Sequence, residues 1–536
     1  MSNFKLSNLY NTEIVVCSIK HYRLLFCFIS LITIIGCQRR QDLIHSDAKK
    51  NHNNFEPIVT DLLLTIPPVL SIYSHADNET SLLLTTADVA RFDNKSELVS
   101  YNQSLQIIDA DEPWPPRWYT CPPYYTKEMF NQITAKNQYR YDMTIDAKVE
   151  SGYLSFYKIL SQQNMGVGQL HAPDFAGYIL LNSKYEAIDT VMSKEPGFNM
   201  YFHDLRLGKS NERMVDMKKN IKLDLRKYAN EERFKAVNCN VDYIQILDTN
   251  NNVVFSWDPL KNLNPSVFRF KETLKGRAFA SRHADLIEWT RLTSALWDYD
   301  GNILYAMKEI GIGKISRLDG HIIWQINYSD LPIISENDTL DWVQPHDFNL
   351  LSETDSSVIY SLFSNGEGLK KAKGVIFEMI KKTQKVKLVK YINPKTIFKC
   401  DGQGNLSYLT NGDYAIGYGF FETSDTISGY RSVLEYQKTN GSFGVYQLPQ
   451  WNYTYKAHIL TNWNKPPRPT ILKTKDSLYV KEDTQDLTWY KLYGEGNMSI
   501  KKVGQGKSIK FEKNASYCVE KKYGIGYSVS KLFKVE

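Results

Sequence analysis

The sequence lacks several features that would assign it to a familiar functional class. Its 536 residues contain only 7 cysteines with no CxxC spacing, so neither a zinc site nor a disulfide framework is indicated. The net charge of +6 is small for this length and gives no reason to expect a nucleic-acid partner. P-loop, GxSxG, HExxH and dinucleotide-binding motifs are absent from the sequence. We therefore expect no metal, no cofactor and no nucleic acid.

Long hydrophobic runs are also scarce, apart from one near the start of the chain. The apolar run LLFCFISLITIIG at residues 24–36 follows Lys20 and Arg23 and ends at Cys37. A run of this length behind basic residues is typical of a secretory signal and is too short to span a bilayer of roughly 30 Å as a helix. The boundary Ile34-Ile35-Gly36-Cys37 resembles the lipobox of bacterial lipoproteins.

This boundary predicts three consecutive N-terminal functions. Residues 1–36 would be a signal peptide, Cys37 the lipidated residue, and residues 37–57 a polar, solvated tether. The protein would then be anchored by lipid in a bacterial cell envelope, on the periplasmic or surface face of an outer membrane if the cell has one. An ordinary signal followed by a chance cysteine is the alternative.

Helical periodicity is scarce from residue 170 to 450, where strand–turn–strand patterns predominate. Three stretches read as a strand, a polar turn with Asn or Gly, and a strand ending in an aromatic residue: residues 244–257, 314–324 and 433–446. Similar units start near residues 291, 346 and 403, about 55 residues apart. Two hairpins per repeat make a four-stranded sheet, and such sheets repeated around an axis make a β-propeller.

We therefore predict an all-β protein with about six four-stranded blades over residues 166–461. An open array of β-sandwiches is the rival architecture. Residues 58–165 contain short alternating runs, which we interpret as a separate β-rich N-terminal region. The prolines at residues 466–469 mark a boundary, because closely spaced prolines cannot donate to a sheet. Alternating strands then predict a small C-terminal β-sandwich over residues 465–536.

The middle of the chain resembles the bacterial arylsulfotransferase family over about residues 170–535. The resemblance rests on the order and spacing of Ala176-Gly177-Tyr178-Ile179-Leu180-Leu181, Phe202-His203-Asp204-Leu205, residues 241–257, residues 294–304, Pro345-His346-Asp347-Phe348 and Tyr455-Lys456-Ala457-His458. It implies a six-bladed propeller with an added β-domain. It also implies transfer of a sulfuryl group between phenols through a sulfated histidine, without a nucleotide cofactor.

That chemistry defines the candidate site residues. A neutral imidazole must attack sulfur, a second histidine must move the proton of the phenol, and cationic donors must hold the sulfate oxygens. The resemblance indicates His346 and His203 as catalytic residues and Arg291, Lys371 and Lys373 as binding residues. A structural role for each histidine, and a solvated turn for the lysines, are the alternatives.

The sequence departs from the family pattern at two places. Arg291 stands where the first family histidine is expected, and an arginine can clamp sulfate but cannot attack sulfur because it stays protonated. No histidine occurs between His346 and His458, so the later family nucleophile has no counterpart. His283 could substitute only if its loop folds back. Equivalent positions of successive blades face one axis, so we expect His203, Arg291 and His346 to approach one another.

Two functions remain open at this stage. The first is an enzyme that binds a small anionic or phenolic ligand and transfers a sulfuryl group. The second is a propeller that binds a ligand or a protein partner without chemistry, an expectation by analogy of fold alone. A quinone-dependent dehydrogenase is disfavoured because the chain has no adjacent cysteine pair.

Overall fold

The computed structural model describes residues 70–91, 98–120, 144–159, 176–208, 210–226, 232, 235–263, 286–288, 290–335, 338–366, 371–395, 400, 402–419, 421–422, 430–448, 452–493 and 499–536. The predicted signal peptide, the tether, Cys37 and His283 lie outside these residues. The chain divides into a first unit, Met1–Ile58 with Asp93–Ser96, and a second, Val59–Phe92 with Glu97–Glu536. Within its described part, no helix is long and apolar enough to cross a membrane.

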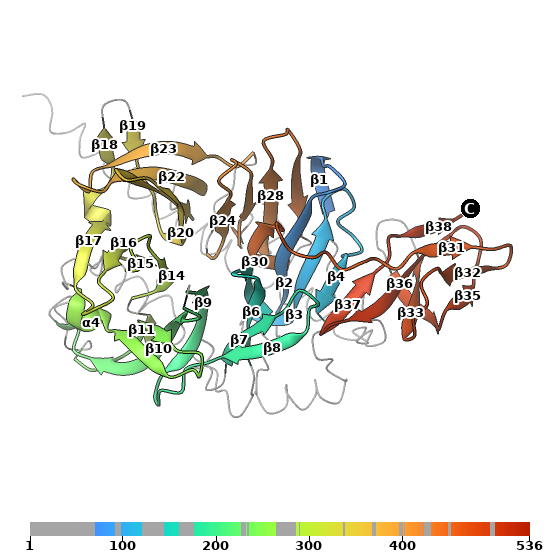
Figure 1. Cartoon of the computed structure of the whole chain (residues 1–536), viewed down its shortest axis with the longest axis horizontal. Helices are drawn as coiled ribbons and strands as arrows, with labels where there is room; N and C mark the ends of the chain where they lie inside the picture. The colour runs from blue at the N-terminus through green and yellow to red at the C-terminus, as the bar shows by residue number, and fades with distance from the viewer. Residues whose placement is uncertain are drawn as a thin grey trace, which may run out of the picture. The chain divides into compact units, whose positions relative to one another are not determined.

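Five consecutive sheets of the second unit follow the chain in order (Figure 1). The first contains β5 (Thr144–Glu150), β6 (Tyr153–Ile159), β7 (Ala176–Leu181) and β8 (Ala187–Val191). The second contains β9 (Asn199–Leu207), β10 (Arg213–Leu223), β11 (Val237–Leu247) and β12 (Val253–Trp257), with β13 (Leu286–Glu288) parallel to β11. The third contains β14 (Leu292–Trp297), β15 (Ile303–Met307), β16 (Gly311–Ile315) and β17 (Ile322–Asn327).

The fourth sheet contains β20 (Pro345–Glu353), β21 (Ser357–Ser364), β22 (Lys373–Ile380) and β23 (Val386–Ile392). The fifth contains β24 (Asn405–Tyr408), β25 (Tyr414–Gly417), β28 (Val433–Gln437) and β29 (Phe443–Gln447), and β1 (Leu70–His75) adds to its outer edge. Short connecting elements are α4 (Pro259–Asn262), η4 (Tyr328–Asp330), β18 (Ile333–Ser335) with β19 (Asp338–Leu340), and β26 (Phe421–Glu422) with β27 (Tyr430–Arg431).

The sixth sheet is built from distant parts of the chain. Its innermost strand is β30 (Asn452–Ile459), which pairs with β2 (Ser81–Arg91); β3 (Leu98–Asp109) and β4 (Trp118–Thr120) follow. The inner strands β5, β9, β14, β20, β24 and β30 each contact the next, and β30 contacts β5. These contacts close a ring of six blades, which confirms the predicted propeller.

The ring includes residues that the sequence assigned elsewhere. Strands β5 and β6 complete the first blade, and β2, β3 and β4 complete the sixth, although residues 58–165 were expected to form a separate β-rich region. The propeller therefore begins before the expected boundary at residue 166. The cause is that β30 has no other strand of its own to pair with, so the N-terminal strands supply its sheet.

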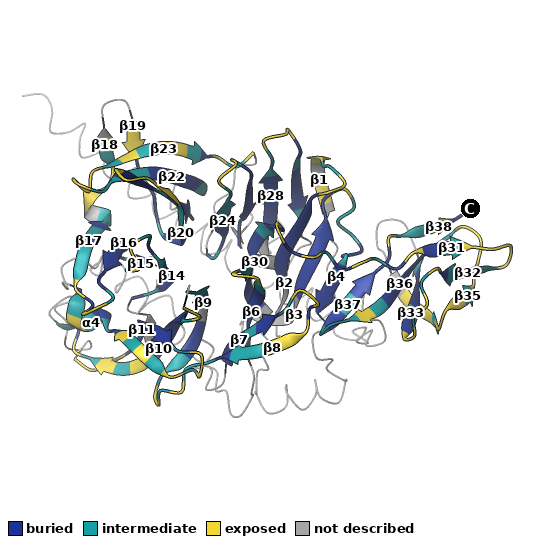
Figure 2. Ribbon diagram, viewed as in Figure 1, coloured by how far each residue is buried: buried dark blue, intermediate teal, exposed yellow. Residues whose placement is uncertain are grey.

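Turn chemistry and packing explain the blades. In the third blade, Gly301 adopts φ 79° between β14 and β15, as the Asn and Gly turn pattern predicts. The aromatic residue that ends a blade packs on the next blade. Trp257 stacks on Tyr305 with ring centroids 5.3 Å apart and donates from Nε1 to the carbonyl of Gly320 at 2.9 Å. Inner strands are largely buried, whereas outer strands such as β8 and β23 carry exposed residues (Figure 2).

The C-terminal module is a β-sandwich, as predicted. One sheet contains β31 (Ile471–Lys473), β32 (Ser477–Val480) and β35 (Ser508–Lys510). The other contains β33 (Leu487–Tyr493), β34 (Ser499–Gln505), β36 (Ala515–Tyr523), β37 (Gly526–Val529) and β38 (Phe533–Val535). Leu478, Trp489 and Val519 are part of the core between them. Strand β37 pairs with β4, so this sheet continues the sixth blade. The described cysteines Cys239, Cys400 and Cys518 are buried and form no disulfide with one another.

Candidate functional site

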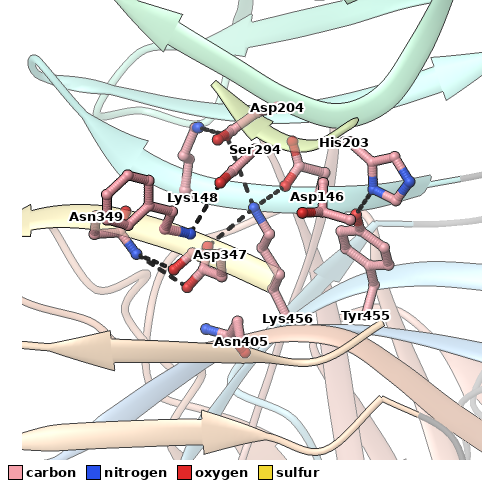
Figure 3. A network of polar contacts seen from close by, with 12 residues as sticks. Asp146, Lys148, His203, Asp204, Ser294, Asp347, Asn349, Asn405, Tyr455 and Lys456 are labelled. Atoms are coloured by element: carbon pink, nitrogen blue, oxygen red, sulfur yellow. Dashed lines mark hydrogen bonds and ion pairs between the residues drawn. The ribbon is translucent and has the colours of Figure 1, made fainter. Parts of the chain in front are cut away.

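One polar residue from each inner strand lies near the propeller axis (Figure 3). These residues are Asp146, Asp204, Ser294, Asp347, Asn405 and Lys456. Their side chains join neighbouring blades. The Phe348 N–H donates to Ser294 Oγ at 2.9 Å, and the Leu406 N–H donates to Asp347 Oδ2 at 3.2 Å. Asn405 Nδ2 donates to the Ala457 carbonyl at 2.8 Å.

The charged members of this ring form a layer that we call the carboxylate layer: Asp146, Asp204 and Asp347 with Lys456, Lys148 and Arg206. Lys456 Nζ lies 2.6 Å from Asp146 Oδ1 and 3.4 Å from Asp347 Oδ1. It also lies 3.8 Å from Asp204 Oδ1. Arg206 Nε donates to Asp204 Oδ2 at 3.0 Å, and Lys148 forms a second ion pair with Asp204. Three carboxylates thus face three cations.

Burial and charge act in opposite directions on these groups. Burial alone would raise the pKa of Asp204, but Arg206, Lys148 and Lys456 outweigh it and hold that pKa well below its usual range. Burial raises the pKa of Asp146 to about 6 even though Lys456 lies beside it. Burial would lower the pKa of Lys456, but its three carboxylate neighbours raise it. Lys456 therefore stays charged at the centre of the layer.

The backbone is distorted where two of these carboxylates stand. Asp146 has φ 55° and Asp347 has φ 50°, in the left-handed region that few non-glycine residues adopt. Both lie where the strand pairing is irregular, between Ile145 and Lys148 in one case and between His346 and Asn349 in the other. Such bulges redirect side chains and are common beside functional sites. Figure 3 shows both carboxylates directed at Lys456.

The residues just before Asp204, Asp347 and Lys456 form a second cluster, which we call the imidazole layer: His203, His346 and Tyr455. The ring centroids of His203 and His346 are 5.5 Å apart, and that of Tyr455 lies 6.0 Å from each. His203 Nδ1 and the Tyr455 hydroxyl are 2.5 Å apart. His203 is partly exposed, so this cluster reaches solvent on its side.

His346 is a buried, neutral imidazole. The residue is 3% exposed, and its Nδ1 has no hydrogen-bond partner among the described residues. Burial, with the charges of Lys456 and Lys308, lowers the pKa of His346 to about 3. A hydrogen bond to the Gly404 backbone favours the protonated ring, so the carbonyl accepts it. Because Nδ1 is unpartnered, we infer that Nε2–H donates this bond and that Nδ1 presents its lone pair.

The structure brings His203 and His346 together as predicted from the ring geometry. Arg291 directly precedes β14, with φ 44°, a partly buried side chain and a carbonyl that accepts from the Lys308 N–H at 2.9 Å. Lys373 begins β22, the third strand of its blade, and Lys371 lies two residues before it. Lys373 Nζ sits 3.5 Å from the ring centroid of Tyr391 on the outermost strand β23. The described contacts do not bring these two lysines to the histidines.

Sequence reasoning missed several residues of the site. Lys308 is largely buried, and its charge acts on His346. A signal for it exists, because Leu292 pairs with Met307 and so places Arg291 and Lys308 side by side. Tyr455 and Lys456 were noticed only as part of the propeller exit. Aligning Tyr455-Lys456 with the two His-Asp pairs would have placed both on the axis.

No group of three or more histidine, cysteine or acidic residues that could hold a metal ion occurs in the described parts of the chain. The carboxylates of the axis are instead neutralised by lysine and arginine. Next to these ion pairs, the imidazole layer holds two imidazoles and a phenol, and the charge of Lys308 acts on His346.

Residues 161–424 match the model of a family described as arylsulfotransferase (ASST). Among curated proteins, none matches the chain. A GH32 β-fructofuranosidase of Bombyx mori is similar to 76% of this chain over 92% of its own, with 10% identity and a TM-score of 0.30. An endo-arabinase of Bacteroides thetaiotaomicron is similar to 72% of this chain over 96% of its own, with 9% identity and a TM-score of 0.27. Similarity at this level identifies neither a substrate nor an activity.

Proposed function

We propose that the imidazole layer binds an aryl sulfate and transfers its sulfuryl group to a phenol, because residues 161–424 match the arylsulfotransferase family model. The observation that carries this proposal is His346, a neutral imidazole with an unpartnered Nδ1, 5.5 Å from a second imidazole. A nucleophile that stays uncharged and a partner that can move a proton are the two groups this reaction needs.

In the first half-reaction, the Nδ1 lone pair of His346 attacks sulfur. The bond between sulfur and the aryl oxygen breaks, and His203 gives its proton to the leaving phenoxide. In the second half, the acceptor phenol loses its proton to His203 and attacks the sulfur held on His346. The imidazole of His346 leaves readily, because a ring of low basicity is a good leaving group. Arg291 and Lys308 supply positive charge for the sulfate oxygens.

The test uses a chromogenic aryl sulfate as donor and a simple phenol as acceptor. We expect His346→Ala to reduce kcat by at least about 1,000-fold, because the unpartnered Nδ1 of His346 is the nucleophile of the proposed transfer. Arg291→Ala should raise KM as well. His321→Ala is the matched control, because that histidine is exposed and pairs only locally with Asp319. Wild-type activity in His346→Ala would reject the proposed role.

A binding or scaffold protein without chemistry is the second candidate. One observation favours it: the carboxylate layer uses its cations internally, and no histidine lies between His346 and His458. Titration calorimetry with a sulfate ester separates the two functions. Binding with no release of the chromogenic phenol over long incubation would support the scaffold function and reject the transferase.

We further propose that the protein acts in a bacterial envelope, held by lipid on Cys37. Its small anionic or phenolic ligand would then come from outside the cytoplasm. The support is the apolar run and the Ile34-Ile35-Gly36-Cys37 boundary. Cys37→Ser should leave the chain unprocessed or release it from the membrane fraction. A variant that fractionates and migrates like the wild type would contradict the anchor.

A further inference from the structure

Tyr455 has no role in the proposed transfer so far, although it touches its centre. It lies on β30, the last inner strand, at the position that His203 and His346 occupy on their own strands. The residue is 1% exposed, and its hydroxyl oxygen lies 2.5 Å from His203 Nδ1. This contact is the shortest polar link within the imidazole layer that the described residues provide, and it joins two blades.

The phenol is held in its protonated form. Burial raises the pKa of Tyr455 well above its ordinary value, and the nearby carboxylates Asp146, Asp204 and Asp347 raise it further. A phenol is a stronger hydrogen-bond donor than acceptor, whereas an imidazole nitrogen with its lone pair is a strong acceptor. The Tyr455 hydroxyl therefore donates to His203 Nδ1.

This direction fixes the other side of the ring. A neutral imidazole carries one proton, so acceptance at Nδ1 places that proton on Nε2. Histidines in functional sites are commonly held in one tautomer by a partner of this kind. His346 has the same tautomer, but the other nitrogen is engaged: its Nε2–H bonds to Gly404 and its Nδ1 is unpartnered.

We propose that Tyr455 is a positioning residue that locks His203 in its Nε2–H form, so that His203 faces the leaving aryl oxygen as a proton donor while His346 faces sulfur with a lone pair. The inference rests on the proposed sulfuryl transfer. The neutral ring donates a hydrogen bond in the ground state and gives up its Nε2 proton as the S–O bond breaks. The Tyr455 proton moves to Nδ1 in the same step, so the ring stays neutral and the negative charge rests on the Tyr455 oxygen. Lys456 Nζ lies 5.8 Å from the centroid of the Tyr455 ring, and the acceptor phenol later returns the proton through His203.

The first experiment measures how the rate depends on the leaving group in Tyr455→Phe. A nitrophenyl sulfate releases a stable phenoxide and needs little proton donation, whereas phenyl sulfate releases a basic phenoxide and needs much. We expect kcat of Tyr455→Phe to fall about tenfold more with phenyl sulfate than with the nitrophenyl donor, since general acid catalysis contributes roughly 100-fold or more.

Tyr157→Phe is the matched control. Tyr157 is equally buried and loses a hydroxyl that donates to the Met200 carbonyl at 3.1 Å, outside the imidazole layer. We expect this variant to reduce kcat by the same factor with both donors. An equal loss with both donors in Tyr455→Phe would overturn the proposal, because it would show a structural effect only.

The second experiment does not depend on turnover. Nitrogen NMR of protein labelled at histidine reports which ring nitrogen carries the proton, and His203→Gln identifies the resonance. We expect the wild type to show the Nε2–H form at His203 and Tyr455→Phe to show a mixture. If the tautomer is unchanged in Tyr455→Phe, the proposal is wrong. If the wild type shows the expected tautomer but turns over neither donor, the positioning contact stands and the transferase function fails.

Discussion

Adjacent residues on the same inner strands form two layers with opposite properties. In the carboxylate layer, every charge meets an opposite charge: Lys456 pairs with Asp146 and Asp347, and Arg206 with Asp204. In the imidazole layer, one residue earlier along β9, β20 and β30, the groups are uncharged or partly exposed, and His346 Nδ1 lacks a partner. The two layers therefore share the same strands, but one consists of paired charges and the other of mostly uncharged groups.

The difference shows how one buried polar centre can contain both a fully paired set of charges and an unpaired imidazole nitrogen. Ion pairs removed from water cost several kcal/mol each in desolvation and are tolerated only when every partner is present. The carboxylate layer meets that condition and so links four blades, through β5, β9, β20 and β30. The imidazole layer lies beside this frame and leaves the Nδ1 of His346 unpaired, which costs about 1–3 kcal/mol.

Removing the shared cation should have the largest effect on the comparison. Lys456→Met leaves the carboxylates Asp146, Asp204 and Asp347 buried together with one positive charge fewer to balance them. We expect the free energy of unfolding to fall by about 3–5 kcal/mol, measured by urea denaturation. Lys510→Met, at an exposed site on β35, serves as control and should change stability by less than about 0.5 kcal/mol. Equal midpoints for the two variants would show that the layer is not a frame.

Acid should weaken the fold through the imidazole layer by a smaller amount. The pKa of His346 falls from 6.5 to about 3 on folding, so the unfolded chain binds the extra proton between these values. The stabilisation is complete above pH 6.5 and is lost as the pH falls towards 3, by up to about 1.4 kcal/mol per pH unit.

The check is urea denaturation of wild type and His346→Gln at pH 7 and pH 5. The wild type should lose about 2 kcal/mol more than the variant across this interval. His458, whose pKa is lowered to about 4, adds a similar term that both proteins keep. A wild type and a variant with the same pH dependence would show that His346 is not held neutral by the fold.

The uncharged members of the ring should contribute least. Ser294→Ala removes the acceptor of the buried Phe348 N–H and leaves that donor unpaired. We expect a loss of about 1 kcal/mol in the free energy of unfolding, since the lost hydrogen bond is neutral. A loss as large as that of Lys456→Met would mean that neutral links, rather than ion pairs, hold the blades in register. Thermal denaturation with calorimetry can compare the two variants directly.

The local parts of this structure could be predicted from the sequence. Hairpins with Asn or Gly turns, the spacing of the repeats and the axial position of His203 and His346 all follow from patterns within one blade. The sixth blade could not be found in this way. Strand β30 pairs with β2, several hundred residues earlier, and no local periodicity reports such a pairing.

Charges on different blades were equally hard to predict. Asp146 and Lys456 form an ion pair only because the ring closes between β5 and β30. The expectation for Lys373 rested on the family resemblance, which places it near a sulfate-binding position, but distance from the axis depends on the order of strands within a blade. As β22 is the third strand of its sheet, Lys373 meets Tyr391 on β23.

The carboxylate layer and the imidazole layer are both completed only when β30, the last inner strand, closes the ring. This strand supplies both Tyr455 and Lys456, and it follows the other five inner strands in the sequence. While the chain is being made, Asp146 and Asp204 must wait for their common cation, and His203 for its phenol. Pairings over such separations form late in folding. A chain without β30 therefore lacks both the ion pair of Lys456 with Asp146 and the contact of Tyr455 with His203.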